Sequence, residues 1–413
     1  MAARDGLSVS PPRPLDVNYD EAAVPAYTLP DALSCSDGKR AATTKLWFER
    51  RRPELLAAFA REMYGEAPRE GWTLQTDRAR TLHVPLEGAL RCEWHFEVRT
   101  SEGRLPGTLL VWAPAGATEP VPVFVGLNFF GNQSVHPDAT IEPARGWVPN
   151  NPEYGLSDHR ASDASRGCHA HRWPVADIVR RGYALATCYA GDFDPDFDDG
   201  FRNGAHALFP EHRATAGDGA WGAIGAWAWG MSRLLDVLEA DDRVDLRRVI
   251  AIGHSRFGKT ALWAAAQDAR FAMAISNCSG RGGAALSRRA FGERVRHLNE
   301  RFPHWFCGNF RRYGDREAKL PFDQHALLAL MAPRPVYVAS ASEDLWADPQ
   351  GEFLACQAAG AVYEALGDRG ADSIGYHVRP GVHDITAFDW AHYLDFADAH
   401  LWTSHRQSRR LLR

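Results

Sequence analysis

Short apolar segments alternate with longer amphipathic segments through the second half of the chain. Each apolar run has the length of a strand, and most are followed by a turn and a segment of helical periodicity. The expected strands are 183–188, 248–253, 271–276, 335–340 and 375–378, and the expected helices are 220–239, 257–267, 351–366 and 387–402. Strands in this pattern lie parallel in a sheet that is covered on both faces. The alternation therefore predicts an α/β fold with three layers and a mostly parallel central sheet.

The first half of the chain is less regular. Residues 1–40 are polar and rich in proline, and we expect them to form an extended N-terminal arm. A helix is expected over 43–63, with strands at 72–74, 90–98, 107–112 and 122–128. Two weakly periodic stretches, near 131–172 and 280–320, are expected to be insertions. Because no linker interrupts the rest, we expect a single domain over 41–413.

Charge and hydropathy exclude several classes of protein. The chain has 47 basic and 52 acidic residues, a formal net charge of −5. This mildly acidic balance argues against general binding to nucleic acid or to anionic membranes. No apolar run reaches the roughly 18 residues that a membrane span needs. Residues 1–19 have no apolar core typical of a signal peptide, so the compartment stays open.

A serine between a predicted strand and a predicted helix is the main catalytic candidate. The segment reads Gly253-His-Ser255-Arg-Phe-Gly258 and follows an apolar run. A serine on such a turn exposes its hydroxyl at the carboxyl edge of the sheet, and the next backbone N–H can stabilise an oxyanion. The second glycine comes one place later than in G-x-S-x-G. The alternative is a tight turn in which Ser255 only caps the helix.

A nucleophilic serine needs a base and an orienting carboxylate. In α/β-hydrolases these follow the serine in the order acid, then histidine, each after a later strand. Asp344 follows the expected strand 335–340, and His383 follows the expected strand 375–378. The alternative for His383, one of 17 histidines, is a capping or core role.

The metal-binding patterns in the sequence are incomplete. The acidic run 194–200 is similar to a calcium loop, but Pro195 interrupts it and Ala205 stands where the loop needs glutamate. Cys168, His169 and His171 lack a completing pair of ligands, and we interpret them as loop residues near the cleft. These patterns therefore do not predict a metal site.

With these residues in place, the chain resembles the glucuronoyl esterases of carbohydrate esterase family 15, and their bacterial branch in particular. The resemblance rests on Ser255-Arg-x-Gly-Lys259 together with the stretches 191–201, 282–289, 302–306 and 346–349. It implies an α/β-hydrolase without metal or cofactor. The implied reaction is cleavage of esters between 4-O-methyl-glucuronic acid on xylan and lignin alcohols.

The resemblance also implies roles for individual residues. Ser255 would be the nucleophile and His383 the base, Arg256 would stabilise the oxyanion, and Lys259 would contact sugar hydroxyls. Glu293 and Trp346 match sugar-binding positions less securely. The alternatives are a solvated surface position for Lys259, a surface carboxylate for Glu293 and a loop anchor for Trp346.

One position departs from the family pattern. Many members carry the triad acid as glutamate just after the strand that follows the nucleophile helix, where this chain has Cys278. Some bacterial members use an acid on the later strand, which here is Asp344. A thiol has a pKa near ~8.5 and cannot hold an imidazolium by charge unless it is ionised.

The function we expect is therefore a serine esterase of glucuronoxylan, including its ester links to lignin. Two alternative functions stay open. One is an acetyl-xylan esterase. The other is a carbohydrate-binding relative with weak or no catalysis, which is considered because Cys278 stands where many family members have the triad acid. We expect a monomer that binds neither nucleic acid nor membranes, and the resemblance implies a secreted or periplasmic protein.

Overall fold

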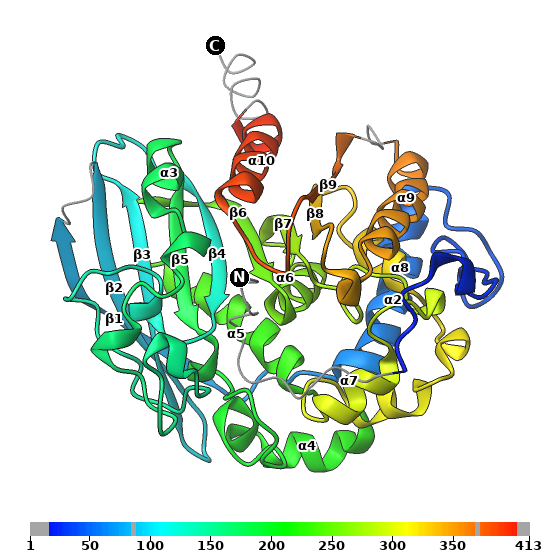
Figure 1. The fold of residues 1–413 in the computed structure, drawn as a ribbon, viewed down its shortest axis with the longest axis horizontal. Helices are drawn as coiled ribbons and strands as arrows, with labels where there is room; N and C mark the ends of the chain where they lie inside the picture. Colours follow the sequence, from blue (N-terminus) through cyan, green and yellow to red (C-terminus); the bar gives the residue numbers. More distant parts are fainter. Residues whose placement is uncertain (1–15, 84–87, 368–371, 403–413) are drawn as a thin grey trace.

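Nine strands form one sheet in the order β1-β2-β3-β5-β4-β6-β7-β8-β9 (Figure 1). The computed structural model describes residues 16–83, 88–367 and 372–402. The strands are β1 Thr73–His83, β2 Ala89–Arg99, β3 Arg104–Pro114, β4 Val121–Asn128, β5 Ala184–Tyr189, β6 Val244–His254, β7 Phe271–Asn277, β8 Val336–Ala341 and β9 Ile374–Arg379. Strands β4 to β9 pair in parallel, whereas β1, β2 and β3 are antiparallel and join the sheet where β3 meets β5. The predicted mostly parallel sheet is confirmed.

Helices cover both faces of this sheet. They are α1 Thr44–Leu46, α2 Arg52–Phe59, α3 Val175–Arg180, α4 Pro210–Ala216, α5 Ala223–Leu238, α6 Arg256–Gln267, α7 Val295–Arg301, α8 Gln324–Ala329, α9 Pro349–Ala365 and α10 Ala387–Ala397. Side chains of β4 alternate between two cores, as the pleat requires. Val123 and Val125 pack with residues of α2, α5, α6, α8 and α9, whereas Phe124 packs with residues of α3 and α10. The three-layer arrangement follows from this alternation.

The N-terminal segment packs against the second expected insertion. The Asn18 carbonyl accepts a hydrogen bond from the Gly292 N–H at 2.9 Å, and the Glu21 carboxylate pairs with Arg289 at 2.7 Å. The Pro30 carbonyl lies 2.9 Å from the ring Nε2 of His325. Residues 1–15 of the expected arm and 403–413 of the expected domain lie outside the described residues. Within the described part of the chain, no helix is both long enough and apolar enough to cross a membrane.

Strand β1 is much longer than expected. The sequence indicated only 72–74, but β1 extends to His83 and pairs with β2 along that length. It lies at the edge of the sheet, and its residues from Gln75 to Arg78 are mostly polar and exposed. These exposed residues lack the apolar signal on which the sequence prediction depended.

Candidate active site

Ser255 lies on a sharp turn between β6 and α6. Its backbone has φ 59° and ψ −125°, a conformation that a residue with a Cβ adopts only under strain. The Ser255 N–H donates to the Asn277 carbonyl at 2.8 Å, which ties the turn to the end of β7. Ser255 is at the N-cap position, but its side chain makes no capping hydrogen bond. The helix therefore does not use the hydroxyl, which argues against a purely structural role for Ser255.

Two glycines let this turn close. A Cβ on Gly253 would lie 1.9 Å from the Phe257 carbonyl oxygen, so no other residue fits there without a shift. A Cβ on Gly258 would lie 3.0 Å from both the Ser276 Oγ and the Ser279 Cβ. The second glycine thus lets α6 approach the end of β7, and this close approach falls at position 258. The later position of the second glycine follows from that packing.

The structure brings Asp344 and His383 together at the carboxyl edge of the sheet. Asp344 follows β8, His383 follows β9, and the Asp344 Oδ2 lies 2.5 Å from the His383 Nδ1. The other ring nitrogen, Nε2, has no hydrogen-bond partner among the described residues. The ring of His254, which precedes Ser255, lies 4.5 Å from the His383 ring between centroids. The carboxylate thus fixes the imidazole while Nε2 keeps the capacity to exchange a proton.

Cys278 lies beside this pair. Its Sγ, an Asp344 carboxylate oxygen and a His383 ring nitrogen all lie within 4.8 Å of one another. Burial, and then the negative charges of Asp344 and Glu352, raise the pKa of the Cys278 thiol well above its usual value. The thiol is therefore neutral at ordinary pH. It cannot replace a carboxylate in stabilising an imidazolium, which leaves Asp344 as the group suited to that task.

Arg256, the first residue of α6, is held in place by Asp196. Its guanidinium donates to the Asp196 Oδ2 and stacks over the Trp305 ring at 4.7 Å. The ring nitrogens of His304 and Trp305 lie 2.9 and 2.8 Å from the other Asp196 oxygen. Burial alone would raise the pKa of Asp196, but the charge of Arg256 and these hydrogen bonds hold it below its ordinary range. An ionised Asp196 thus fixes a cation next to Ser255.

Sequence reasoning did not assign roles to Asp196, His304 and Trp305. Asp196 belongs to the acidic run considered as a calcium loop, and its structural role there is to bind Arg256. Both 191–201 and 302–306 were among the stretches that carried the family resemblance. That resemblance was the only signal, because the contact joins residues 60 and 108 positions apart.

Replacing Arg256 with glutamine is expected to lower kcat on the order of 10²-fold, comparable to the loss of one oxyanion donor. Steady-state kinetics would distinguish this loss of kcat from a change in KM. A change in KM alone would mean that Arg256 binds the substrate in its ground state and does not stabilise the oxyanion. Asp196→Asn should give a smaller loss in the same direction. Asp198→Asn is the matched control, because Asp198 is exposed and, among the described residues, accepts a hydrogen bond only from the Gly200 N–H.

Lys259 and Glu293 also meet in the structure. Lys259 is 4% exposed, which excludes a solvated surface position. Its Nζ donates to the Ser279 carbonyl at 2.5 Å and lies 3.9 Å from the Glu293 carboxylate. Burial raises the pKa of Glu293, and the charges of Lys259, Arg301 and Arg281 oppose that rise. Glu293 is 5% exposed, so it is a buried carboxylate and not a surface one.

Trp346 adjoins the same group. Its backbone carbonyl accepts the Glu293 N–H at 2.9 Å, and a side-chain hydrogen bond from Trp346 lowers the pKa of Glu293. The indole stacks on His297, with ring centroids 5.5 Å apart, and Arg301 lies 5.0 Å above it. The indole is therefore held in place by these contacts, as a loop anchor would be, but part of the ring stays exposed. All three residues expected to bind sugar are neighbours, directly or through Glu293.

A buried carboxylate, Glu352 of α9, joins the loops that carry these side chains. One Glu352 oxygen accepts from the Ser279 Oγ at 3.1 Å and the Gly280 N–H at 2.8 Å, and the other accepts from the Ser340 Oγ at 2.5 Å. Burial raises the pKa of Glu352 to about 7, although the three donors oppose the rise. The sequence offered no signal for Glu352 beyond its place in an amphipathic helix.

The raised pKa of Glu352 predicts a pH-dependent stability. Its ordinary value is 4.5, so the folded protein holds this proton more tightly than the unfolded chain does. The resulting stabilisation is fully present below about pH 4.5 and is lost as the pH rises through about 7. Relative to Glu352→Gln, the wild type should therefore lose free energy of unfolding across this range. Parallel denaturant titrations of both proteins would show it, and identical pH profiles would contradict it.

The histidines set aside as metal ligands lie near the catalytic histidine candidate. His171 contacts the Asp384 carboxylate at 3.1 Å, and the Arg172 Nε donates to it at 2.6 Å. Asp384 immediately follows His383. His169 is buried among aromatic rings, and burial holds its pKa well below the usual value. These residues form the packing beside His383, as expected for loop residues near the cleft.

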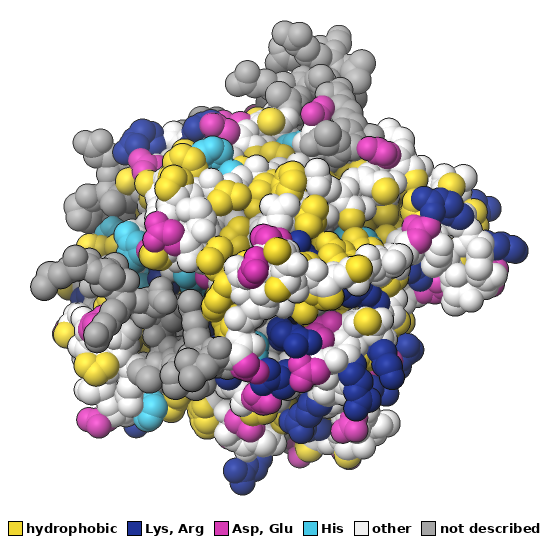
Figure 2. Space-filling view, turned by 45° about the vertical axis from the view of Figure 1, so that its right-hand side comes forward, with side chains coloured by type: hydrophobic (Ala, Val, Ile, Leu, Met, Phe, Trp, Pro, Cys, Tyr) yellow, Lys and Arg dark blue, Asp and Glu magenta, His cyan; other side chains and the backbone are white. Residues whose placement is uncertain are grey.

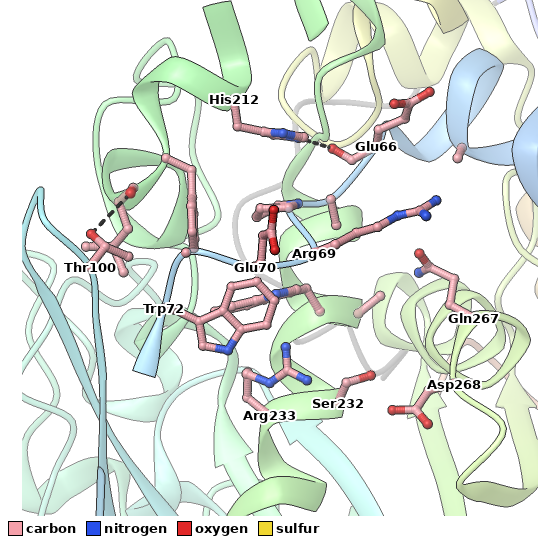
Figure 3. Close-up of a pocket in the computed structure, with 18 of the residues that line it drawn as sticks. Glu66, Arg69, Glu70, Trp72, Thr100, His212, Ser232, Arg233, Gln267 and Asp268 are labelled. Atoms are coloured by element: carbon pink, nitrogen blue, oxygen red, sulfur yellow. Dashed lines mark hydrogen bonds between the residues drawn. The ribbon is translucent and has the colours of Figure 1, made fainter. Parts of the chain in front are cut away.

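Figure 3 shows residues that line a cavity of about 900 Å³ elsewhere in the molecule. Trp72, Arg69 and Gln267 are among the residues that line it. Gln267 ends α6, whereas Ser255 precedes its first residue, and a helix of this length spans about 18 Å. Neither Ser255 nor His383 lines the cavity. This cavity is therefore not the candidate active site at Ser255 and His383.

A family model resembles part of this chain, and several known proteins resemble it along most of its length. The family model described as "Glucuronyl esterase, fungi" matches residues 213–367. Carbohydrate esterase MZ0003, from an unknown prokaryotic organism, is 47% identical over 403 residues, which is 94% of this chain and 93% of that protein. A promiscuous CE15 esterase from a marine bacterial metagenome has a structure with a TM-score of 0.88 and 46% identity, covering 93% of this chain and all of that one.

A glucuronoyl esterase from Solibacter usitatus gives a TM-score of 0.83 at 43% identity, over 92% of this chain and 100% of its own. The similarity to MZ0003 covers nearly the whole of both proteins at a level of identity that shows common descent. Together with the catalytic turn and the sheet topology, it establishes that this chain belongs to carbohydrate esterase family 15, the glucuronoyl esterases.

Proposed function

We propose that this protein is a serine esterase that hydrolyses esters of glucuronic acid, with Ser255, His383 and Asp344 as its triad. The observation that carries the proposal is the Asp344–His383 hydrogen bond beside the strained Ser255 turn. The three side chains come from the ends of three parallel strands, in the chain order typical of α/β-hydrolases. Membership in family 15 supports the substrate class, since its relatives include a glucuronoyl esterase.

In the proposed mechanism, His383 Nε2 takes the proton of the Ser255 hydroxyl as the oxygen attacks the ester carbonyl. The carbonyl oxygen becomes an oxyanion, which Arg256 stabilises with a full positive charge. The imidazolium then gives its proton to the departing alcohol, and an acyl-enzyme remains. Water, activated by the same imidazole, hydrolyses that intermediate and releases the uronic acid.

Two carboxylates keep this machinery in position. Asp344 holds the His383 Nδ1 proton, which leaves Nε2 free to act as base, and it stabilises the imidazolium when that forms. Asp196 holds Arg256 by its guanidinium, so the cation is oriented before the oxyanion develops. A charge positioned in advance costs no reorganisation during the reaction.

Lys259, Glu293 and Trp346 form the proposed sugar-binding group. Lys259 and Glu293 offer a donor and an acceptor for hydroxyls, and the indole offers an apolar face and an N–H. Because these groups are buried or half-buried, a sugar with a misplaced hydroxyl would leave one of them without a partner. The site should therefore discriminate between epimers of the uronic acid.

Lys259→Met, which keeps length and removes charge, is expected to lower kcat/KM for benzyl glucuronate about 10²-fold or more. It should change hydrolysis of p-nitrophenyl acetate little, because a small acetyl group does not reach the lysine. Equal losses on both esters would contradict sugar binding by Lys259. The wild type should also prefer glucuronate over galacturonate esters.

The same assays distinguish the rival functions. Faster turnover of acetylated xylan than of glucuronate esters by the wild type would favour an acetyl esterase. Saturable binding of glucuronoxylan fragments without turnover of any ester would favour a carbohydrate-binding protein.

We further propose that the natural substrate is glucuronoxylan, including its ester links to lignin, and that the protein acts as a monomer outside the cytoplasm, where such polymers occur. Basic and acidic side chains are intermingled over the face shown in Figure 2. This distribution supports a partner other than nucleic acid, which requires a concentrated basic surface.

A further inference from the structure

The side chains of Cys278, Asp344 and His383 form a set of three donors of different kinds. A sulfur, a carboxylate oxygen and a ring nitrogen lie within 4.8 Å of one another. The proposed mechanism uses the carboxylate and the imidazole but assigns nothing to the thiol. Where the family resemblance places a glutamate, this chain therefore has a soft donor beside the catalytic base.

Two of these donors have binding capacity that the protein does not fill. The Asp344 Oδ1 is buried and has no hydrogen-bond partner among the described residues, although Asp344 is 1% exposed. The Cys278 Sγ, on a residue 2% exposed, makes one long contact, 3.9 Å from the Asp384 carbonyl. A buried carboxylate oxygen without a donor is costly, and a cation would satisfy it.

We propose that Cys278, Asp344 and His383 bind a thiophilic divalent cation such as Zn²⁺ or Cd²⁺, and that the bound cation reversibly inhibits the enzyme. Zinc takes cysteine sulfur, histidine nitrogen and carboxylate oxygen at about 2.0–2.3 Å, in a tetrahedron with ligands about 3.5 Å apart. Donors that lie up to 4.8 Å apart need to approach by about 1 Å, and the Asp344 Oδ2 and His383 Nδ1 atoms, 2.5 Å apart, need to separate by about as much; side-chain rotation supplies both movements. Water completes the tetrahedron.

The charges and protons balance. The thiol loses its proton on binding, so the thiolate and the Asp344 carboxylate together neutralise the two positive charges of the metal. If the metal takes the His383 Nδ1, the ring's remaining proton moves to Nε2, which then cannot accept the proton of Ser255. If the metal takes Nε2, it occupies the base directly. Either mode releases one proton to solvent and removes the base.

Metal binding can be tested apart from activity. Cd²⁺ titrated into the Ser255→Ala protein is expected to produce the ultraviolet charge-transfer band of a cadmium–thiolate bond, with one ion bound per chain. Cys278→Ala in the same background should lose the band. The matched control is Cys168→Ala, because Cys168 is half-buried and adjoins His169 in the other cysteine–histidine pattern of the chain. Loss of the band in Cys168→Ala, or its persistence in Cys278→Ala, would overturn the proposal.

Inhibition, which rests on the proposed function, is tested on the otherwise wild-type enzyme. Zn²⁺ should inhibit ester hydrolysis and EDTA should restore it, while Cys278→Ala should need on the order of 10²-fold more Zn²⁺ for half-inhibition. Equal sensitivity of the two enzymes would overturn the inhibitory role. If no ester were hydrolysed at all, the proposed function would fail, whereas the cadmium band would still decide whether the cluster binds metal.

Discussion

Replacing Ser255 with alanine is expected to lower kcat for glucuronate esters about 10⁶-fold, the largest effect of any single substitution in this protein. Without the hydroxyl there is no atom to form the acyl-enzyme, and the remaining rate comes from oxyanion stabilisation and substrate binding. Alanine has the same backbone preferences as serine at φ 59°, so the strained turn should persist. Steady-state hydrolysis of benzyl glucuronate measures the loss, and thermal unfolding checks that the fold is unchanged.

The histidine provides the control for this prediction. His383→Ala should cost nearly as much, and the double variant should be no slower than Ser255→Ala, because a nucleophile and its base act as a unit. Losses that multiply in the double variant would mean that the two residues act separately. An active Ser255→Ala protein would refute the serine mechanism altogether.

Asp344→Asn is expected to lower kcat by about 10²–10⁴-fold. The carboxylate accepts the Nδ1 proton of His383 at 2.5 Å, and an amide would both remove the charge and offer a donor that favours the wrong tautomer. The chain has no second carboxylate at position 278 to compensate. Single-turnover measurements should place the loss in the chemical step and leave substrate binding largely intact.

The neighbouring thiol supplies the matched comparison for Asp344. Cys278→Ala removes a neutral group and should be mild, whereas Cys278→Glu in the Asp344→Asn background should restore part of the activity by returning a carboxylate to the site. If Cys278→Ala proved more damaging than Asp344→Asn, the acid would have been assigned to the wrong position.

The core of the fold could be predicted from the sequence because strands β4 to β8 are mostly buried and appear as short apolar runs. Strand β9, at the other edge of the sheet, is only half-buried but was also expected. Each expected range from β4 to β9 lies within one or two residues of the observed ends, except where β6 begins earlier, at Val244. Only the start of strand β1 could be predicted, because the residues that follow, from Gln75 to Arg78, are polar and exposed at the edge of the sheet. An apolar pattern in the sequence indicates burial, so it does not reveal a strand whose side chains are exposed.

The same distinction applies to the site. Asp344 and His383 could be placed because each lies in the loop just after a predicted strand, and the ends of parallel strands share one edge of the sheet. The contact between Asp196 and Arg256 could not, because it depends on how a loop folds back over the sheet. The hydrogen bonds of Glu352 could not be predicted either, because Ser279 and Gly280, which donate to it, precede it by more than 70 residues.

The parts of the site come from different sections of the chain. Ser255, Asp344 and His383 stand on strand ends, whereas Glu293, which we propose as a sugar contact, comes from the second insertion, 280–320. Lys259 and Trp346 lie in the chain beside Ser255 and Asp344, so only the part of ligand choice that Glu293 carries is encoded apart from bond-breaking. Exchanging this insertion between family members should change selectivity among uronic acids while acyl transfer continues, provided His304 and Trp305 are kept to hold Asp196. The fold therefore offers a route by which one hydrolytic apparatus can diversify, through recombination of a single loop region.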